Sequence, residues 1–342
     1  MTTAFGLDIT TTSVKAVSLK RVSNALVLDS VGVLPISTKG IMSESVVDQQ
    51  MLADSIKKLI ESAQIKTNAV NVALPESQVY VKIIEMPDLS EHELTAALRW
   101  EMEQYVPLPE DQVRTAWQIM GKKQGEGKKT MDVLLIAAPI TVIKKYEDIL
   151  SLANLIPQTV ETEILSIHRA VYPLLNTPDT CMIVNLGAST TDVAITKGGV
   201  LKMIFSIGVG GAAITRAISL DLGVDIIKAE EYKRTVGLNQ SMLEGKVSRS
   251  LAPILDSIAQ DLKKTIFSYK EKNPAEQIKQ LILSGGSAQI PAIDSFLTNT
   301  LNIPVVLGNS FKLYNISNVP DQVSNDFASY NVVIGLALKD LV

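Results

Sequence analysis

Apolar residues follow two repeating patterns along the chain. Short apolar runs, such as residues 70–74 and 281–283, end at turn residues and predict strands. Apolar residues spaced three and four apart, as over 46–63 and 254–269, predict amphipathic helices. Because strands and helices alternate over most of the chain, the pattern indicates an α/β fold.

Two predicted hairpins share one plan. The first turns at residues 10–13 and the second at residues 185–191, each between two apolar runs. Gly, Ala, Ser and Thr dominate the second turn and hydroxyl residues the first, so backbone N–H groups and hydroxyls can approach an anion. One such hairpin is usually only a turn. Two of the same plan indicate two similar halves, whose turns would hold one phosphate tail across a cleft.

The pattern over residues 85–156 differs from that of the two halves and predicts a compact α+β unit. Ser90 and Glu93 form a capping-box pattern at the start of a predicted helix over 91–105. Two strands with a solvated tip and a second helix follow. We interpret this unit as an inserted subdomain.

The rest of the chain divides into two predicted domains. Domain I comprises residues 1–84, 157–176 and 328–342. Domain II comprises residues 177–327 and includes a helical subdomain at about 212–278. The expected fold class is therefore α/β, with two domains and one insertion.

Composition narrows the class of protein. The chain has 342 residues, a net charge of −4 and no long basic run, which argues against nucleic acid as a partner. Cys181 is the only cysteine, so no intrachain disulfide can form, as in a reduced cytoplasmic protein. We find no signal peptide and no apolar stretch that could cross a bilayer. Two histidines and one cysteine do not favour a structural zinc site.

Six motifs are more specific together than singly: residues 6–8 with 13–15, then 99–107, 185–192, 208–215, 229–233 and 284–286. In this order they resemble the actin-like nucleotide-binding superfamily, which includes actin, DnaK-type chaperones, sugar kinases and FtsA. The resemblance covers nearly the whole chain and implies an actin-like (ribonuclease H-like) two-domain fold.

Within that superfamily the chain most resembles the PilM family of type IV pilus assembly proteins. The unit at 85–156 is similar to the extra subdomain of FtsA and PilM, which actin and the chaperones lack. FtsA usually carries a basic amphipathic helix for membrane attachment, and we find none before Val342. The PilM family is therefore preferred.

The resemblance implies a site for ATP and Mg²⁺. Asp8 would orient a water-coordinated magnesium, and Lys15 would neutralise phosphate charge. Glu163 would position the attacking water or act as a general base. The other implied nucleotide ligands are Thr11, Thr12, Ser13, Asn185, Gly187, Ala188, Ser189, Thr190, Gly210, Gly211, Glu230, Lys233, Gly285, Gly286 and Ser287.

Each of these residues also has a plain structural interpretation, which stays open. Asp8 can stabilise a turn, and Lys15 can be a solvated strand lysine. Glu230 and Lys233 can form an ordinary ion pair on a helix surface. The glycines can form tight turns without a ligand, and Glu163 can be a solvated glutamate.

Two positions depart from the superfamily pattern, which usually has Gly at position 10 and Asp at position 185. Thr10 is β-branched and would narrow the turn if its φ had to be positive. Asn185 removes a negative charge that would help to hold magnesium. We therefore predict ATP binding with feeble or no turnover, at most a slow ATPase.

The resemblance also implies a partner. PilM-like proteins are taken to capture the cytoplasmic N-terminal tail of a single-pass membrane protein, PilN. The chain would then be a cytoplasmic scaffold at the inner face of the cytoplasmic membrane, reaching the membrane only through its partner. An extended peptide would add to a strand edge in a groove between the first domain and the insertion, with 91–105 and 131–138 as walls.

Three alternatives stay open. One is an FtsA-like cell-division or cytoskeletal ATPase that forms filaments, and another is a sugar-kinase-like enzyme. The third is self-association of the scaffold, which the sequence does not decide.

Overall fold

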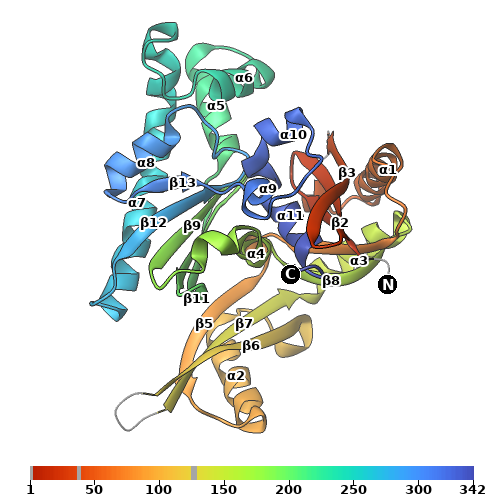
Figure 1. Ribbon diagram of the computed structural model, residues 1–342, viewed down its shortest axis with the longest axis vertical. Helices are drawn as coiled ribbons and strands as arrows, with labels where there is room; N and C mark the ends of the chain where they lie inside the picture. The colour runs from red at the N-terminus through yellow and green to blue at the C-terminus, as the bar shows by residue number, and fades with distance from the viewer. Residues whose placement is uncertain (1–2, 37–39, 125–128) are drawn as a thin grey trace.

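Figure 1 shows the computed structural model, which describes residues 3–36, 40–124 and 129–342. Two five-stranded sheets lie side by side, and a three-stranded unit projects below them. The first sheet has the order β3-β2-β1-β4-β8. Its strands are β1 (Phe5–Ile9), β2 (Ser13–Val22), β3 (Ala25–Pro35), β4 (Ala69–Leu74) and β8 (Ile156–Thr162).

The second sheet repeats this arrangement. Its order is β11-β10-β9-β12-β13, with an antiparallel meander followed by parallel strands, as in the first sheet. The strands are β9 (Thr180–Leu186), β10 (Thr191–Lys197), β11 (Val200–Ile207), β12 (Ile278–Ser284) and β13 (Val305–Leu307). The prediction of two halves built alike is confirmed.

The projecting unit has its own small core. Its strands β5 (Tyr80–Pro87), β6 (Val113–Gln124) and β7 (Lys129–Pro139) pair in the order β5-β7-β6. Helix α2 (Glu91–Tyr105) packs Leu94, Leu98 and Met102 against this sheet. The predicted capping box is confirmed, because Ser90 Oγ accepts from Glu93 N and Glu93 Oε2 accepts from Ser90 N at 2.9 Å.

Helix α3 (Ile140–Leu152) packs elsewhere than we expected. Its residues Tyr146 and Ile149 share a core with Phe5 of β1 and with Leu52 of α1 (Val46–Ser62). The segment 85–156 therefore spans two packing environments. We propose narrower bounds, 80–139, for the inserted subdomain and place α3 in domain I.

Helices cover the second sheet and extend its upper end in Figure 1. The long helix α7 (Lys246–Lys272) packs Leu251, Leu255 and Leu262 against the apolar side chains of β9 and β12. Further helices of this half are α5 (Gly211–Leu222), α6 (Ile226–Thr235) and α8 (Ile293–Leu301). Two short helices, α9 (Ser310–Leu313) and α10 (Asp321–Asn325), instead pack Phe311 and Val323 into a core with Val17 of β2. Short 3-10 helices lie at Gly40–Met42, Glu76–Gln78, Glu110–Gln112, Leu243–Gly245 and Phe327–Tyr330.

Two helices, α4 (Glu163–Leu175) and α11 (Asn331–Leu338), cross between the sheets (Figure 1). A Cβ added to Gly335 of α11 would overlap the backbone carbonyl of Ser166 in α4, so the helices pack backbone to backbone there. From α11, Asn331 Nδ2 donates to Ser284 Oγ of β12 at 3.0 Å. From the first sheet, Asn71 Nδ2 donates to Leu336 O at 3.1 Å. The helix pair thus joins both sheets.

An ion cluster around the buried carboxylate of Glu161 lies at the end of α11. Arg169 Nη1 and Nη2 donate to the Glu161 carboxylate at 2.7 and 2.9 Å, and Lys339 Nζ donates to it at 2.6 Å. Burial by itself would raise the pKa of Glu161, but these two cations and their hydrogen bonds outweigh it and lower the pKa. In the described ranges, no helix is both long and apolar enough to cross a membrane.

Gly335→Ala is expected to destabilise the fold by about 1–3 kcal/mol, because the new methyl group forces α4 and α11 apart. Denaturant unfolding measures this change. Gly121→Ala is the matched control, since its added Cβ would have no heavy atom within 4 Å. Equal unfolding free energies for the two variants would contradict the close crossing.

Glu161→Gln is expected to lower the melting temperature at pH 7. A carboxyl whose pKa is lowered by folding stabilises the protein above its usual pKa of 4.5, and this contribution is lost as pH falls through the folded value. The difference between variant and wild type should therefore shrink below about pH 4. Glu271→Gln, on the exposed face of α7, serves as control. A difference that is constant with pH would contradict the ion cluster.

Candidate functional site

A cleft of about 1350 Å³ lies between the two halves. Both predicted turns line it, residues 10–13 from one side and 187–190 from the other. Across the gap, the hydroxyls of Thr11 and Ser189 are 3.2 Å apart and hydrogen-bonded. The turns therefore face each other, as the sequence predicted.

The first turn is organised by the side chain of Thr10. Its Oγ1 accepts from Ser13 N at 3.0 Å and from Thr12 N at 3.2 Å, and it donates to Ser13 O at 2.9 Å. Thr10 is not among the described residues with a positive φ. The expected narrowing of the turn therefore does not arise, and a β-branched residue fits this position.

Asp8 and Lys15 face each other at the base of the first hairpin. They are paired residues of β1 and β2, and Asp8 is buried. Lys15 Nζ donates to Ser329 O at 2.9 Å, so the lysine reaches across to the segment before α11. Burial raises the pKa of Asp8, and the Lys15 charge opposes this only in part. Neither residue is a solvated surface group.

The second turn is held by the start of α5. Gly211 N donates to Gly187 O and Ala212 N donates to Ala188 O, both at 2.8 Å. Gly210 lies behind the turn, where an added Cβ would be 2.7 Å from Thr190 N. Its position is structural, whereas Gly211 lines the cleft.

In α6, the buried Lys233 forms an ion pair with the partly exposed Glu230. Lys233 is 4% exposed, and its Nζ lies 2.6 Å from Glu230 Oε2 and 3.0 Å from Thr215 Oγ1. Burial by itself would raise the pKa of Glu230, but the Lys233 charge, with hydrogen bonds from its neighbours, brings it down to about 2. Burial lowers the pKa of Lys233. The alternative of a surface ion pair does not fit this burial.

The glycine turn after β12 closes the cleft from the second sheet. Gly285 has a φ of +98°, and an added Cβ would lie 2.5 Å from Leu186 O. Only glycine fits both conditions without strain. Next to it, Ser287 N donates to Leu186 O at 3.1 Å.

Most of the predicted site residues meet at this cleft. Those that line it are Asp8, Thr11, Thr12, Ser13, Lys15, Glu163, Asn185, Gly187, Ala188, Ser189, Thr190, Gly211, Glu230, Lys233, Gly285, Gly286 and Ser287. Sequence reasoning missed several others, including Thr215, Arg216, Ile226, Ile227, Asp326 and Ser329. Ile226 and Ile227 are exposed apolar residues at the start of α6, and they give one rim of the cleft an apolar surface.

Sequence reasoning also missed a carboxylate cluster beneath the cleft. Single carboxylate oxygens of Glu76, Glu163 and Asp192 all lie within 4.8 Å of one another. Burial, together with the Asp192 charge, raises the pKa of Glu76 to about 8. Burial and the neighbouring acids raise the pKa of Glu163 well above its usual value, and burial raises that of Asp192. Glu163 is therefore a partly exposed glutamate that lies beside two other acids at the cleft.

The sequence held a signal for each missed member of this cluster. Asp192 is the last residue of the 185–192 motif and the second residue of β10. Glu76 follows Pro75 directly after β4, at the carboxyl end of a parallel strand. Loops at such strand ends commonly carry functional groups.

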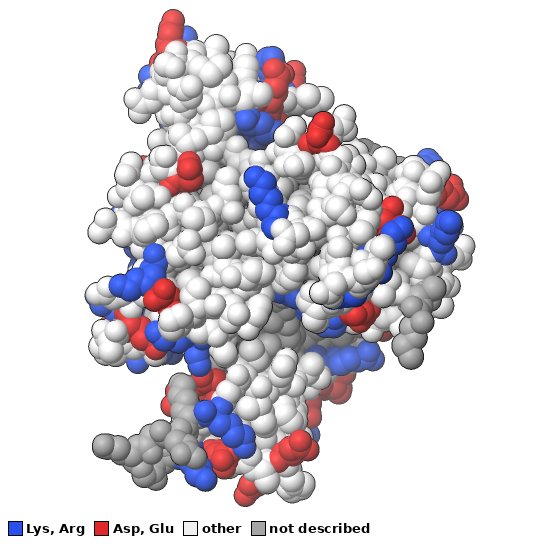
Figure 2. Space-filling view, viewed as in Figure 1, with Lys and Arg blue, Asp and Glu red and all other residues white. Residues whose placement is uncertain are grey.

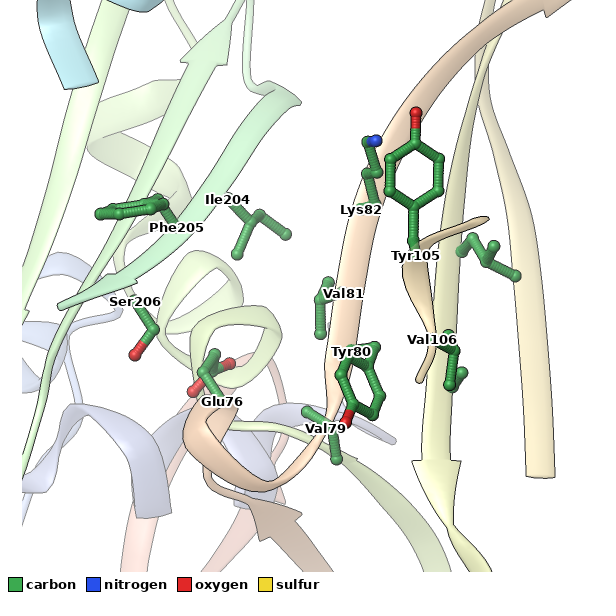
Figure 3. A pocket seen from close by; sticks show the side chains of 12 residues that line it. Glu76, Val79, Tyr80, Val81, Lys82, Tyr105, Val106, Ile204, Phe205 and Ser206 are labelled. Atoms are coloured by element: carbon green, nitrogen blue, oxygen red, sulfur yellow. The ribbon is translucent and has the colours of Figure 1, made fainter. Parts of the chain in front are cut away.

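A second cavity, a groove of about 330 Å³, lies beside the inserted subdomain (Figure 3). One wall is residues 79–82 on and before β5, and the facing wall is residues 204–206 of β11. Helix α2, which we expected to form a wall of the groove, contributes only its last residue, Tyr105. Leu135 and Ala137 of β7 also line the groove. The wall formed by β11 comes from domain II and was not foreseen.

Charge is interspersed over the molecular face in Figure 2. Lys and Arg side chains on that face alternate with Asp and Glu, and a broad uncharged region covers the centre.

Comparison with known proteins identifies relatives of this chain. A family model described as type IV pilus assembly protein PilM matches residues 6–341. The cell division protein FtsA of Streptococcus pneumoniae serotype 2 (strain D39 / NCTC 7466) is 24% identical over 344 residues, covering 88% of this chain and 74% of that protein.

Solved structures share the fold. A chain of a PilM-PilN type IV pilus biogenesis complex superposes with a TM-score of 0.84 at 23% identity, covering 99% of this chain and 98% of that one. The ethanolamine utilization protein EutJ from Carboxydothermus hydrogenoformans gives 0.57 at 14% identity, covering 98% and 89%. MreB 5 of Spiroplasma citri bound to AMPPNP gives 0.53 at 12% identity, covering 98% and 96%.

These likenesses confirm the predicted actin-like two-domain fold, and the family match extends over almost the whole sequence. The chain therefore belongs to the PilM family of type IV pilus assembly proteins.

Proposed function

We propose that this protein is an ATP-binding, actin-like scaffold of a type IV pilus inner-membrane platform, and that it captures the cytoplasmic N-terminal tail of a PilN-like membrane protein. One observation carries the nucleotide half of the proposal: two hydroxyl-rich turns meet across one cleft, with Thr11 and Ser189 in hydrogen-bond contact. The part of the proposal that concerns the PilN-like tail is based on the groove between β5 and β11.

The phosphates of ATP would lie between the two turns. Hydroxyls and backbone N–H groups of residues 11–13 and 187–190 would bind them, replacing the Thr11–Ser189 contact. The adenosine would lie toward Gly285, Gly286 and the Glu230–Lys233 ion pair. In support, MreB 5 of Spiroplasma citri, which has this fold, was solved with AMPPNP.

The cleft has one position that suits a magnesium ion bound to ATP. Asp8 offers a buried carboxylate, and Mg²⁺ prefers oxygen ligands. A bound Mg²⁺ would neutralise phosphate charge and stabilise ionised Asp8. Asn185 supplies no charge, and its side chain hydrogen-bonds with Asp192. We therefore assign the metal-orienting role to Asp8 alone.

Turnover is proposed to be slow or absent. A general base must be unprotonated to accept a proton from water. Burial and the neighbouring acids raise the pKa of Glu163, which lowers the fraction of this carboxyl that is ionised and able to accept a proton. Steady-state phosphate release at about 1–100 s⁻¹, as in kinases, would contradict this part of the proposal.

The groove would hold an extended peptide. β5 pairs only with β7, and β11 pairs only with β10 within the described strands, so both present unpaired edges. A tail could add to one edge and place apolar side chains against Val81, Val106 and Ile204. A solved relative is named as a PilM-PilN complex, which supports this partner class. The scaffold would then be cytoplasmic and peripheral at the inner face of the membrane, held there by the tail.

Asp8→Ala is expected to weaken Mg-ATP binding at least tenfold in calorimetric titration, because the metal loses its orienting carboxylate. Asp256→Ala, an exposed aspartate of α7, should bind like wild type. Thermal melting checks that both variants fold. Unchanged Mg-ATP affinity in a folded Asp8→Ala variant would remove Asp8 from the site.

Ile204→Asp is expected to weaken binding of the tail at least tenfold, because a charge would face the apolar side of the groove. The probe is a fluorescent peptide of the N-terminal cytoplasmic residues of the PilN-like protein encoded by the same genome, read by anisotropy. Val47→Asp, at an exposed site on α1, is the control. Point variants are preferred to deletion of 85–156, which would remove α3 from the domain I core. Equal affinity of Ile204→Asp and Val47→Asp would place the tail elsewhere.

A further inference from the structure

An ion pair joins the inserted subdomain to domain II beside the groove. Lys202 Nζ of β11 donates to Asp132 Oδ2 of β7 at 2.6 Å. Only 5% of the Asp132 side chain and 21% of the Lys202 side chain are exposed. Because both groups are largely removed from water, salt screens their attraction much less than that of an exposed pair. The pair therefore fastens β7 of the insertion to β11 of domain II.

A β-bulge in β11 sets the direction of the Lys202 side chain. The pairing of β10 with β11 shifts between Ile195 and Thr196, and Lys202 has no paired residue on β10. Bulges commonly redirect a side chain out of the regular alternation of a strand. The bulge lies two residues before Ile204, which lines the groove, so the ion pair forms at the end of the groove wall.

Apolar side chains complete the junction between the insertion and domain II. Ile83 of β5 and Met120 of β6 are partly buried and belong to one apolar cluster with Leu201 and Ile204 of β11. The junction is thus held by this cluster and by the ion pair. A contact of this kind can open locally while the parts on either side of it stay folded.

The junction leaves too little width for a peptide strand between β5 and β11. Neighbouring strands of a sheet lie about 4.8 Å apart, so a strand inserted between two edges needs about 9.6 Å between them. Where β5 and β11 approach each other, their Cα atoms lie within 8 Å. A tail that pairs with one edge and contacts the other wall therefore needs the two strands to move apart.

We propose that the Asp132–Lys202 ion pair is a latch that holds the groove narrow and opposes entry of the tail. This inference rests on the proposed capture of a PilN-like tail and adds the step that limits its association. With the latch closed, only the fraction of molecules that have opened accepts the peptide, and the apparent affinity falls by that fraction. The latch charges therefore slow capture of the tail and are not needed for the fit of its side chains.

Asp132→Asn tests the latch, because it removes the charge and keeps the shape of the side chain. The fluorescent tail peptide should associate with this variant at least threefold faster than with wild type in stopped-flow anisotropy. Lys202→Gln should have the same effect, and the double variant should be no faster than either single variant, since both changes remove one interaction. Asp88→Asn is the matched control, because it breaks an ion pair with Lys122 inside the insertion and should leave the association rate unchanged.

A second readout needs no tail. Ile204→Cys places a thiol in the groove wall, and the native Cys181 is 2% exposed, so a maleimide should react at position 204. Adding Asp132→Asn to this variant should raise the reaction rate at least threefold, because the groove opens more often. Thermal melting checks that each variant folds.

Unchanged thiol reactivity in a folded Asp132→Asn variant would overturn the latch, as would an unchanged rate of tail association. A wild-type chain that does not bind the tail would instead refute the proposed partner. The thiol reaction would then still decide whether the ion pair holds the groove narrow.

Discussion

The backbone crossing of α4 and α11 is the constraint on which the rest of the structure depends. Gly335 leaves no room for a side chain against the Ser166 carbonyl, so the two helices lie as close as their backbones allow. Hydrogen bonds from Asn71 and Asn331 tie this pair to one sheet each. Because both sheets are fixed to the same helices, the β1–β2 and β9–β10 turns face each other across one cleft. The geometry of the site therefore depends on the packing of these two helices, which also line the cleft at Glu163 and Val332.

The parts that could be predicted from sequence are those built from neighbouring residues. Each hairpin, the capping box at Ser90 and Glu93, and the two-halved plan follow from short patterns, and the structure confirms them. The narrowing expected at Thr10 if its φ were positive does not arise, because its hydroxyl closes the turn without a positive φ. A local sequence pattern does not show which hydrogen bonds the Thr10 hydroxyl forms.

What the sequence could not show depends on residues distant in the chain. Glu76 and Asp192 come from different sheets and meet only because the halves close against α4. The groove has a wall from β11, since the inserted sheet lies with its edge strand beside the edge of the second sheet. Helix α3 directly follows the insertion in sequence but packs on α1. The amphipathic spacing of its residues does not determine which element it packs against.

A crystal structure grown with ATP and magnesium is the most direct test of whether both turns bind one nucleotide. We expect the phosphates between residues 11–13 and 187–190, within hydrogen-bond distance of both turns, with the metal on the Asp8 side. Nucleotide bound outside this cleft, or touching only one of the two turns, would contradict it.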